Sequence, residues 1–388
     1  MTRKMKDSGV EWIGEIPEEW EVAKIKYYCD SIYSGGTPSR LEPKYWNGDI
    51  NWIPSGYCKN KEIIEAKEKI TKEALLNSST KLINKDTPLV AMTGATCGFT
   101  GYLKIDACIN QSIMAYIPNK LTNPRFLWYL TLNLYEKYLS LQSGGAQAGI
   151  NSIDAKNICV PYVKIKEQNN IAKILDIKTE QIENIKSTIT KEIQTLEDYR
   201  KSMITEAVTK GLDKNVEMKD SGIEWIGEIP KHWSKIKLRY LSNIVRGGSP
   251  RPINEYMSNS DKDLNWIKIG DTQKGSKYIN KTKNKLKTTG LSSTTFVKKG
   301  ELILSNSMSY GEAYILNIDG CIHDGWLAFK DIKNIDKEYL YFSLLSFNTK
   351  IQFDKLSDGG VVQNLNIDKV KTVYVFLSDK KEQVEIAN

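Results

Sequence analysis

The strongest constraint on the fold of this chain is a long internal repeat. The segment from Met5 to Trp20 returns as Met218 to Trp233, with 13 of 16 residues identical at an offset of 213. Shorter echoes follow in the same order, among them Asn51-Trp52-Ile53 and Asn265-Trp266-Ile267. Solenoid proteins repeat units of roughly 20 to 50 residues, so a repeat this long indicates two domains of one fold.

Local patterns within each half predict short strands and one main helix. The 388 residues are enough for two or three domains of roughly 150 residues each. Apolar runs bounded by Gly, Pro and Asn predict strands at 89–92, 101–105, 113–117, 301–304 and 313–317. Helical spacing predicts helices at 124–141 and 337–345. We therefore predict an α+β fold with two structurally similar domains that contain mixed β-sheets.

The segment between the two halves has a different character. Residues 167–208 contain neither Gly nor Pro. Apolar residues recur there every seven positions, at Leu175, Ile182, Ile189, Leu196 and Met203. A second row that includes Ile185 completes a coiled-coil seam, although Lys178 and Glu192 interrupt it. The pattern predicts a central helix about 63 Å long that stops at Gly211. Its narrow apolar stripe needs a partner helix.

Composition is that of a soluble globular protein, with 40% hydrophobic and 26% charged residues. No apolar run approaches the roughly 20 residues that span a bilayer, and the first residues are charged rather than a signal peptide. We therefore expect a cytoplasmic protein without a membrane partner. A net charge of +8 favours a polyanionic partner. Six dispersed cysteines favour reduced, mostly buried thiols over a disulfide framework or a zinc site.

The combination of these features resembles a known family. Two diverged halves each follow a repeated W-I-G-E-I-P-x-x-W motif, and the helix between them begins with Glu167-Gln168 and ends near Ser202 to Leu212. Over nearly its whole length the chain is similar to the specificity (S) subunit of type I DNA restriction-modification systems. The resemblance implies a non-catalytic protein with two target-recognition domains. Each domain would read one half of a split site in double-stranded DNA.

The resemblance also implies partners that carry the chemistry. Two methyltransferase (M) subunits would dock on the repeated segments and helices, and endonuclease (R) subunits would attach through them. S-adenosylmethionine, ATP and Mg²⁺ are expected only on those partners, and no cofactor or metal is expected in this chain. The repeat and the helix divide the sequence into a first recognition domain at 1–166, a spacer helix at 167–211, a second recognition domain at 212–382 and the start of a second spacer helix at 383–388.

The end of the sequence departs from the family pattern. Full-length members usually carry a second long helix, antiparallel to the first, after the second recognition domain. Here Lys381 to Asn388 begins such a helix and the sequence stops. A naturally shortened subunit, a truncated sequence and a helix supplied by another polypeptide would all look the same. We expect a truncated second spacer helix, and self-association through the uncovered seam of the first.

Motifs for catalysis are weak in this sequence. No G-x-G-x-x-G follows a predicted strand, and Ser276 stands where a P-loop needs lysine. The pair His323-Asp324 would suit half of a metal site, but a polar pair at a strand end, aligned with Asn110-Gln111, is the plainer interpretation. Two alternatives stay open: a non-catalytic scaffold that uses the long helix for assembly, and an enzyme that acts on nucleic acid alone.

Each half contains residues suited to reading DNA. Cations and backbone amides grip phosphates, while forked donors and acceptors match base edges in the major groove. Two Gly-Gly loops combine close backbone approach with a hydroxyl and an arginine; the alternative is an ordinary turn that the fold needs in both halves. The predicted contacts in these loops are Gly35, Gly36, Thr37, Arg40, Arg246, Gly247, Gly248, Ser249 and Arg251.

Two further sets follow the predicted strands. Different residue types at equivalent positions are expected of two domains that read different bases, although solvated loop residues that have drifted apart would look the same. The second set is Thr93, Thr96, Asn110 and Gln111 in the first half, and Ser305, Asn306, Ser309, Tyr310 and Asp324 in the second. The third set is Gln147 and Asn151 against Gln363 and Asn364.

The tryptophans of the repeated segments admit two interpretations. We prefer the one in which Trp12, Trp20, Trp225 and Trp233 pin the start of each domain onto its own core or onto the central helix. The alternative is an aromatic docking site for the M subunit.

Overall fold

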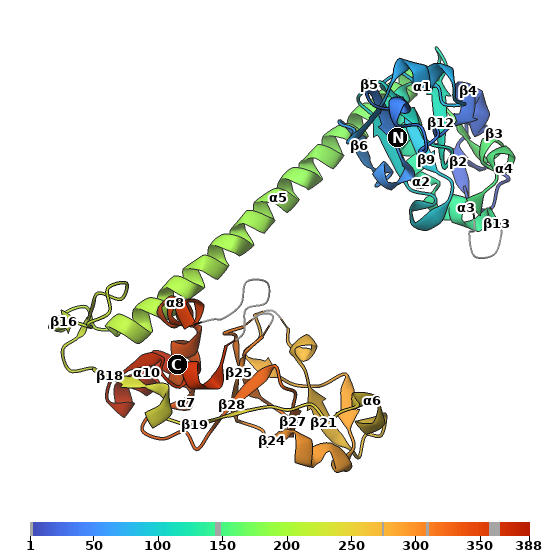
Figure 1. The fold of residues 1–388 in the computed structure, drawn as a ribbon. Helices are drawn as coiled ribbons and strands as arrows, with labels where there is room; N and C mark the ends of the chain where they lie inside the picture. Colours follow the sequence, from blue (N-terminus) through green and yellow to red (C-terminus); the bar gives the residue numbers. More distant parts are fainter. Residues whose placement is uncertain (1–2, 144–148, 274, 308–309, 357–364) are drawn as a thin grey trace. The chain divides into compact units, whose positions relative to one another are not determined.

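A computed structural model describes residues 3–143, 149–273, 275–307, 310–356 and 365–388. The chain divides into two compact units, Met1–Ser187 and Thr188–Asn388, whose strands and helices are labelled in Figure 1. No helix among the described residues is long and apolar enough to cross a membrane. All six cysteines are free thiols, four of them buried, as predicted.

The first unit contains two mixed sheets. Only the β10–β6 pair of the larger sheet and the β11–β5 pair of the smaller one are parallel. The larger sheet has the order β4 (Cys29–Ser34), β12 (Ile113–Pro118), β9 (Pro88–Ala91), β10 (Thr100–Leu103), β6 (Lys61–Ile63). The smaller has the order β7 (Glu68–Ile70), β5 (Trp46–Ile53), β11 (Ala107–Ile109), β8 (Leu82–Ile83). Strand β9 lies in the middle of its sheet. All four of its side chains are buried, as expected of a strand that is covered on both faces.

The second unit repeats this plan. Its larger sheet has the order β19 (Asn243–Arg246), β28 (Trp326–Lys330), β25 (Leu302–Ser305), β26 (Ala313–Leu316), β22 (Tyr278–Ile279). Its smaller sheet has the order β20 (Met257–Ser258), β23 (Asn284–Leu286), β21 (Leu264–Ile267), β27 (Gly320–Ile322), β24 (Thr295–Val297). The parallel pairs again fall at β26–β22 and β21–β27. The prediction of two similar α+β domains with mixed sheets is confirmed.

The main helix of each unit packs on its larger sheet and starts at a side-chain cap. Helix α2 (Pro124–Asn133) begins after Asn123, and α7 (Lys337–Leu345) begins after Asp336. The helix predicted at 124–141 is interrupted at the buried Leu134, whose N–H bonds to Thr131 rather than one residue further back. A second short helix, α3 (Tyr135–Ser140), follows.

The repeated segments form matching hairpins. Strand β1 (Met5–Asp7) pairs with β2 (Glu15–Pro17), and β16 (Met218–Asp220) pairs with β17 (Glu228–Pro230). The chain then enters two equivalent ribbons: β3 (Glu21–Lys24) with β15 (Cys159–Tyr162), and β18 (Ser234–Lys237) with β29 (Tyr374–Leu377). Shorter elements complete the units: α1 (Lys72–Leu76), β13 (Gln142–Ser143), β14 (Gly149–Ile150), α4 (Ser152–Lys156), α6 (Ile253–Tyr256), α8 (Phe347–Leu356) and α9 (Ile367–Val370).

The last tryptophan of each repeated segment is tied to a helix start. Trp20 Nε1 donates to Glu167 Oε2 at 2.7 Å, and Trp233 Nε1 donates to Glu382 Oε2 at 3.0 Å. The preferred interpretation, in which these residues pin the start of each domain, is confirmed for both. Trp225 is instead 37% exposed.

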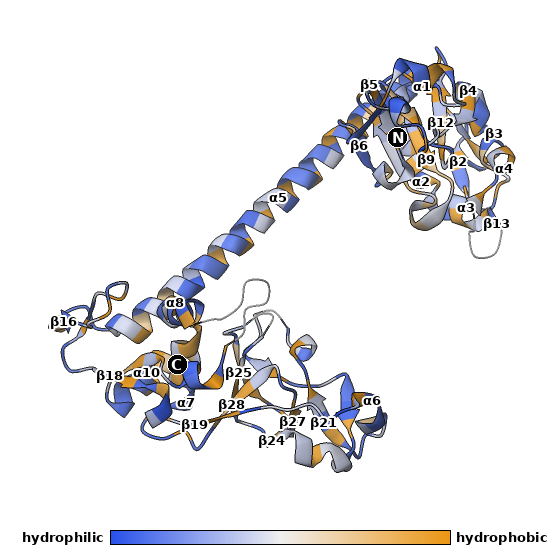
Figure 2. Cartoon of the chain, in the orientation of Figure 1, coloured by the Kyte–Doolittle hydropathy of each residue, from blue (hydrophilic) through white to orange (hydrophobic). Residues whose placement is uncertain are grey.

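Helix α5 (Ile165–Lys210) is continuous over 46 residues and coloured mainly hydrophilic in Figure 2. It begins two residues before the predicted start and ends where predicted, because Gly211 takes the left-handed conformation with φ 75°. Helix α10 (Lys380–Ala387) begins three residues before the predicted start of the second spacer helix. The proposed boundaries between recognition domains and spacers stay a prediction.

The starts of α5 and α10 are each held by a buried glutamine, an arrangement called here the glutamine clamp. Gln168 Oε1 accepts from Asn123 N at 2.8 Å, and its Nε2 donates to Val163 O at 2.7 Å. Gln383 repeats both bonds, accepting from Asp336 N at 2.7 Å and donating to Ser378 O at 2.8 Å. The glutamine therefore joins each helix start to the cap of the main helix of its unit.

Candidate nucleic-acid interface

The Gly-Gly loop of the first unit lies against a strand end. Gly35 N donates to Ile113 O at 3.2 Å, and Gly36 N donates to Ile109 O at 2.9 Å. A Cβ on Gly35 would lie 2.0 Å from Ile109 O. The loop of the second unit is built alike, since Gly247 N donates to Trp326 O at 2.9 Å.

These bonds change the role predicted for the glycines. Gly248 N also donates internally, to Ile322 O at 3.1 Å. The amides of Gly35, Gly36, Gly247 and Gly248 are therefore engaged within the fold, and the close approach that they permit is to the protein's own backbone. For these four residues the structure supports the alternative, a turn needed in both halves. The side chains beside them are the better candidates for contact.

The hydroxyl side chains beside these glycines bond to residues of the second predicted set. The Thr37 hydroxyl bonds to Gln111 Oε1 in the first unit. In the second unit, the Ser249 hydroxyl donates to Asp324 Oδ1 at 2.6 Å. Thr37 and Ser249 follow β4 and β19, whereas Gln111 and Asp324 follow β11 and β27. Each unit thus presents a hydroxyl and an acceptor side chain at the same place, and the acceptor is an amide in one and a carboxylate in the other.

The charge of Asp324 is favoured by its surroundings. The hydrogen bond from Ser249 is the main cause that lowers the pKa of Asp324, with further contributions from His323 and Arg246. Arg246 Nε donates to the backbone oxygen of Asp324 at 3.0 Å. Asp324 is therefore an ionised acceptor at neutral pH, and its side chain is half exposed.

The arginines predicted to contact DNA differ between the units. The Arg40 guanidinium lies 3.7 Å from the ring centre of Trp46 and 5.0 Å from that of Trp52, and it pairs with Glu68 at 2.5 Å. Arg40 is thus held over its own unit's aromatic side chains. Arg246 and Arg251 are both exposed.

A cleft of about 910 Å³ opens beside Asp324 in the second unit. Its lining includes Arg251, Asn254, Trp266, Lys268 and His323. Trp266 is the repeat equivalent of Trp52, over which Arg40 lies in the first unit. The cleft combines two cations with amide, imidazole and carboxylate groups, a mixture suited to phosphates and base edges.

His323 closes a turn beneath this cleft. Its Nδ1 lies 2.6 Å from Gly325 N and its Nε2 lies 3.1 Å from Ile269 N. A neutral ring can accept from one of these N–H groups and a protonated ring from neither. Burial lowers the pKa of His323, against the opposing effect of Asp324. Asn110, its equivalent, accepts from Ser112 N at 3.2 Å, so both residues serve the same turn.

Part of the second predicted set is placed differently from the expectation. Ser305 and Asn306 are 1% and 3% exposed. Neither side chain therefore offers a surface for direct contact with DNA, contrary to the prediction for these two residues. By strand pairing, Asn306 corresponds to the buried Met92 of the first unit. Thr93 is exposed and bridges Gly149.

Thr96 and Tyr310 are held by neighbouring segments. Thr96 Oγ1 donates to Ser55 O at 3.3 Å. The Tyr310 hydroxyl donates to Asp354 at 2.5 Å, and Lys350 Nζ lies 4.2 Å from the centre of its ring. Both residues are partly exposed and stay candidates.

In the third predicted set, Asn151 caps α4, since its side chain accepts from Ile153 N at 2.8 Å. The side-chain oxygen of Asn151 is thus engaged within the fold. The remaining predicted residues Gln147, Ser309, Gln363 and Asn364 lie outside the described residues.

The predicted apolar stripe of α5 is largely exposed. Ile182, Ile185, Ile189, Leu196 and Met203 keep between 50% and 65% of their surface exposed. Leu175 is half-buried. The stripe is therefore uncovered over most of its predicted length within the described chain.

Comparison with known proteins decides the family. The sequence pattern described as the type I restriction modification DNA specificity domain matches residues 17–195 and 230–388. The chain belongs to this family. Two of its relatives in Methanocaldococcus jannaschii cover most of both chains. The MjaVIII type I restriction enzyme specificity subunit is 27% identical over 89% of this chain and 79% of its own length. The putative MjaX specificity subunit is 26% identical over 97% of this chain and 87% of its own length.

Solved structures share the specificity-domain fold. A chain from a structural study of complex assembly and conformational transition of the type I R-M system aligns with a TM-score of 0.71 at 14% identity, over 96% of this chain and 89% of that one. The HsdS subunit from Thermoanaerobacter tengcongensis aligns with a TM-score of 0.54, also at 14% identity, over 96% of this chain and 88% of that one. The predicted class, a non-catalytic specificity subunit with two recognition domains, is confirmed.

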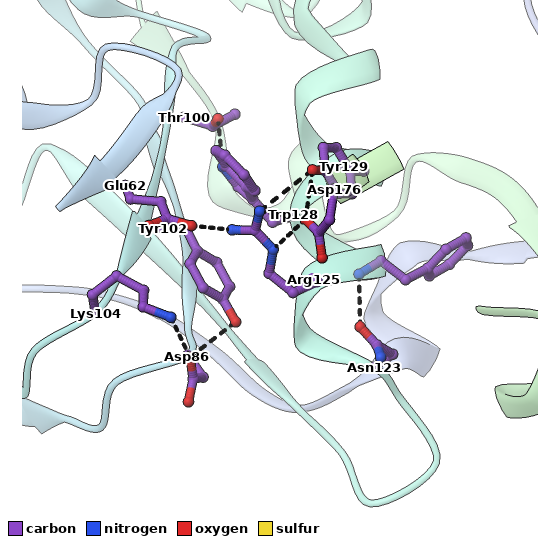
Figure 3. Close-up of polar contacts among 11 residues, drawn as sticks. Glu62, Asp86, Thr100, Tyr102, Lys104, Asn123, Arg125, Trp128, Tyr129 and Asp176 are labelled. Carbon is purple, nitrogen blue, oxygen red and sulfur yellow. Dashed lines mark hydrogen bonds and ion pairs between the residues drawn. The ribbon is translucent and has the colours of Figure 1, made fainter. Parts of the chain in front are cut away.

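One cluster of charged side chains in this specificity-domain protein was not predicted from the sequence. Arg125 of α2 reaches Glu62 of β6 and Asp176 of α5, as Figure 3 shows. The three residues are 63 and 51 positions apart, so no local spacing signals their contact. Among the described residues, no group of three or more His, Cys, Asp or Glu side chains could hold a metal ion.

Proposed function

We propose that this chain reads a split sequence in double-stranded DNA, with each recognition domain contacting one half. The observation that carries the proposal is the equivalent pair at one edge of each domain, Thr37 with Gln111 and Ser249 with Asp324. A glutamine amide pairs with adenine through two hydrogen bonds, and a carboxylate accepts from the amino group of cytosine. One fold with two acceptors suits two different half-sites.

Cations beside these pairs would contact the phosphates. Arg246, Arg251 and Lys268 lie at or next to the cleft of the second domain. Phosphate contacts release counterions, so binding should weaken steeply as salt is raised. The net charge of +8 has the sign required for this partner.

The chemistry of the complex would belong to partner subunits. DNA bound by this chain would be presented to M subunits, two in number, with R subunits attached through them. S-adenosylmethionine, ATP and Mg²⁺ would be bound by these partners. A methyltransferase must take its target base out of the duplex, so this chain would contribute position and sequence choice. The exposed stripe of α5 supports a role in assembly, including self-association of the isolated chain.

A domain exchange tests whether each recognition domain reads one half of the site independently. Residues 218–382 are replaced by the equivalent segment of another specificity subunit, and the modified bases are mapped in cells that express the matching M subunit. We expect one half of the modified motif to change and the other to persist. The reciprocal exchange of residues 5–162 serves as the matched control and should change the opposite half. If both halves change in either chimera, the modular proposal is wrong.

Binding measurements separate this function from that of a protein scaffold. The purified complex is titrated with duplexes that contain or lack the mapped motif, at several salt concentrations. We expect a sequence preference and a loss of affinity with salt. A scaffold that acts only through α5 predicts equal binding to both duplexes.

A further inference from the structure

The Arg125 cluster joins three separate elements of the first unit. Arg125 lies in the first turn of α2, where the helix dipole disfavours a cation. Its Nε donates to Asp176 Oδ1 at 2.9 Å, and its Nη1 donates to Glu62 Oε1 at 2.5 Å. Tyr129 also donates to Asp176 Oδ1, at 2.7 Å. The two carboxylates therefore compensate a cation that the helix position alone would destabilise.

Aromatic rings enclose the guanidinium on its other sides. Its central carbon lies 4.6 Å from the ring centre of Trp128, 4.9 Å from that of Tyr102 and 5.4 Å from that of Tyr129. Figure 3 shows these rings grouped around Arg125. The Arg125 side chain keeps only 24% of its surface exposed. The planar guanidinium stacks on aromatic rings and also donates to two carboxylates. Lysine cannot make both kinds of contact in this geometry.

The second unit holds a charge-reversed counterpart of this cluster, in which Lys277 Nζ lies 5.3 Å from the ring centre of Tyr341 and 5.1 Å from that of Phe342. Glu338 follows its cap Asp336 by two residues, as Arg125 follows Asn123, and it pairs with Lys277. The charge at this position is thus reversed. By contrast, the glutamine clamp and the tryptophan–glutamate bond are present in both units. The second unit therefore folds with the opposite charge at this position of its main helix, and the arginine is particular to the first unit.

The cluster attaches α5 further along its length than the contacts of Glu167 and Gln168 at its start. Asp176 lies eight residues after Gln168, which is about 12 Å along the helix axis. Contacts at the start of a helix restrain its direction less than an additional contact about two turns further along. We propose that Arg125 is a positioning residue that fixes the direction in which α5 leaves the first domain. Through α5 it determines which spacing between the two half-sites the complex accepts. This inference rests on the proposed function.

Spacing preference is the property to measure. The full chain, in complex with its M subunit, is tested for methylation of duplexes with the natural spacing and with one base pair removed or added. We expect Arg125→Gln and Asp176→Asn to reduce the preference for the natural spacing at least about fivefold, a modest coupling between distant sites. The bases recognised within each half should not change. Arg125→Lys, which keeps the charge but loses the fork, should fall between wild type and Arg125→Gln.

A matched control lies on the same helix. Glu183 pairs with Lys186 at 3.8 Å, so both partners belong to α5. Glu183→Gln removes a more exposed carboxylate of α5 without detaching the helix, and it should leave the spacing preference unchanged. Amide exchange across residues 172–182 gives a second readout and should accelerate in Asp176→Asn and in Arg125→Gln but not in Glu183→Gln.

The outcomes separate the two proposals. If the wild-type complex shows no preference among duplexes, the proposed function is wrong. If the wild type selects one spacing and both Arg125→Gln and Asp176→Asn select it equally well, the positioning role is wrong. Should Arg125→Gln fail to fold, Asp176→Asn decides, because Asp176 keeps 39% of its surface exposed and the glutamine clamp is intact in that variant.

Discussion

The hydroxyl of Ser249 donates to the carboxylate of Asp324 across 2.6 Å, and thereby joins the loop after β19 to the loop after β27. The same two loops of the first unit are joined by Thr37 and Gln111. The bond keeps each acceptor side chain in one orientation before any ligand is bound. Preorganisation of this kind lowers the entropic cost of binding.

Asp324→Asn should alter the base choice in one half of the motif. The amide both donates and accepts, whereas the carboxylate only accepts. We expect the affinity for the natural second half-site to fall by about 1–3 kcal/mol, the usual value of one specific base contact, while the first half is read as before. Titration of duplexes substituted in one half at a time measures this. Gln111→Glu is the matched control and should affect only the first half; a shared change in both halves contradicts the assignment.

His323 should make stability depend on pH. The folded pKa lies below the ordinary value of 6.5, so the unfolded chain binds the proton more strongly. The contribution of the neutral ring is complete above pH 6.5 and is lost as the pH falls from there towards the folded pKa. Asp324, Lys268 and Asp271 are the charged groups that influence this ring. Urea unfolding between about pH 7.5 and 5.5 should show the loss.

The substitution that tests this is His323→Asn, because asparagine closes the equivalent turn at Asn110. The variant should lose less stability on acidification than wild type. The chain's other histidine, His232, is exposed and lies 3.0 Å from Glu382, and it is kept unchanged in both proteins. Equal slopes for wild type and His323→Asn would refute the assignment.

Polar substitutions on the α5 stripe should impair assembly but not folding. Ile182→Ser and Leu196→Ser remove exposed apolar surface, so the free energy of unfolding should change by less than about 0.5 kcal/mol per site. We expect the purified wild-type chain to self-associate in sedimentation experiments and the double variant to do so at least about tenfold more weakly. Glu180→Gln on the same helix is the control. A wild-type chain that sediments as a monomer at all concentrations contradicts this prediction.

Loss of a glutamine clamp should destabilise its own domain. Gln168→Ala leaves the partly buried N–H of Asn123 and the buried carbonyl of Val163 without this partner. We expect a cost of about 1–3 kcal/mol and a decrease in Tm of roughly 2–4 °C per kcal/mol. Gln194→Ala, on the exposed face of α5 where Gln194 bonds to Asp198, is the matched control. Equal Tm values for the two variants would show that the clamp contributes little.

The repeat and the helical pattern allowed much of this architecture to be predicted. Two similar domains followed from the identity between 5–20 and 218–233, and the limits of α5 fell within two residues of those expected. Sheet order could not be predicted, because it depends on pairing between distant segments such as β10 and β6. The burial of Ser305 and Asn306 at the end of β25 could not be predicted either, because it depends on the segments that pack around this strand end.

Predictions for the candidate site were less accurate for the same reason. The residues of Thr37–Gln111 and Ser249–Asp324 were chosen from separate motifs, and only the fold showed that they are bonded. The glycine amides looked suited to phosphates because their internal acceptors are far away in the sequence. The Arg125 cluster draws on three elements at once, and no short pattern encodes such a contact.

The two glutamine clamps would allow one recognition domain to be exchanged for another at the start of the adjoining helix. Because Gln168 and Gln383 fasten their helices to Asn123 and Asp336 with the same two bonds, a domain replaced by genetic recombination finds a compatible joint already in place. A new DNA specificity could then be acquired in one crossover, without compensating mutations in the rest of the gene.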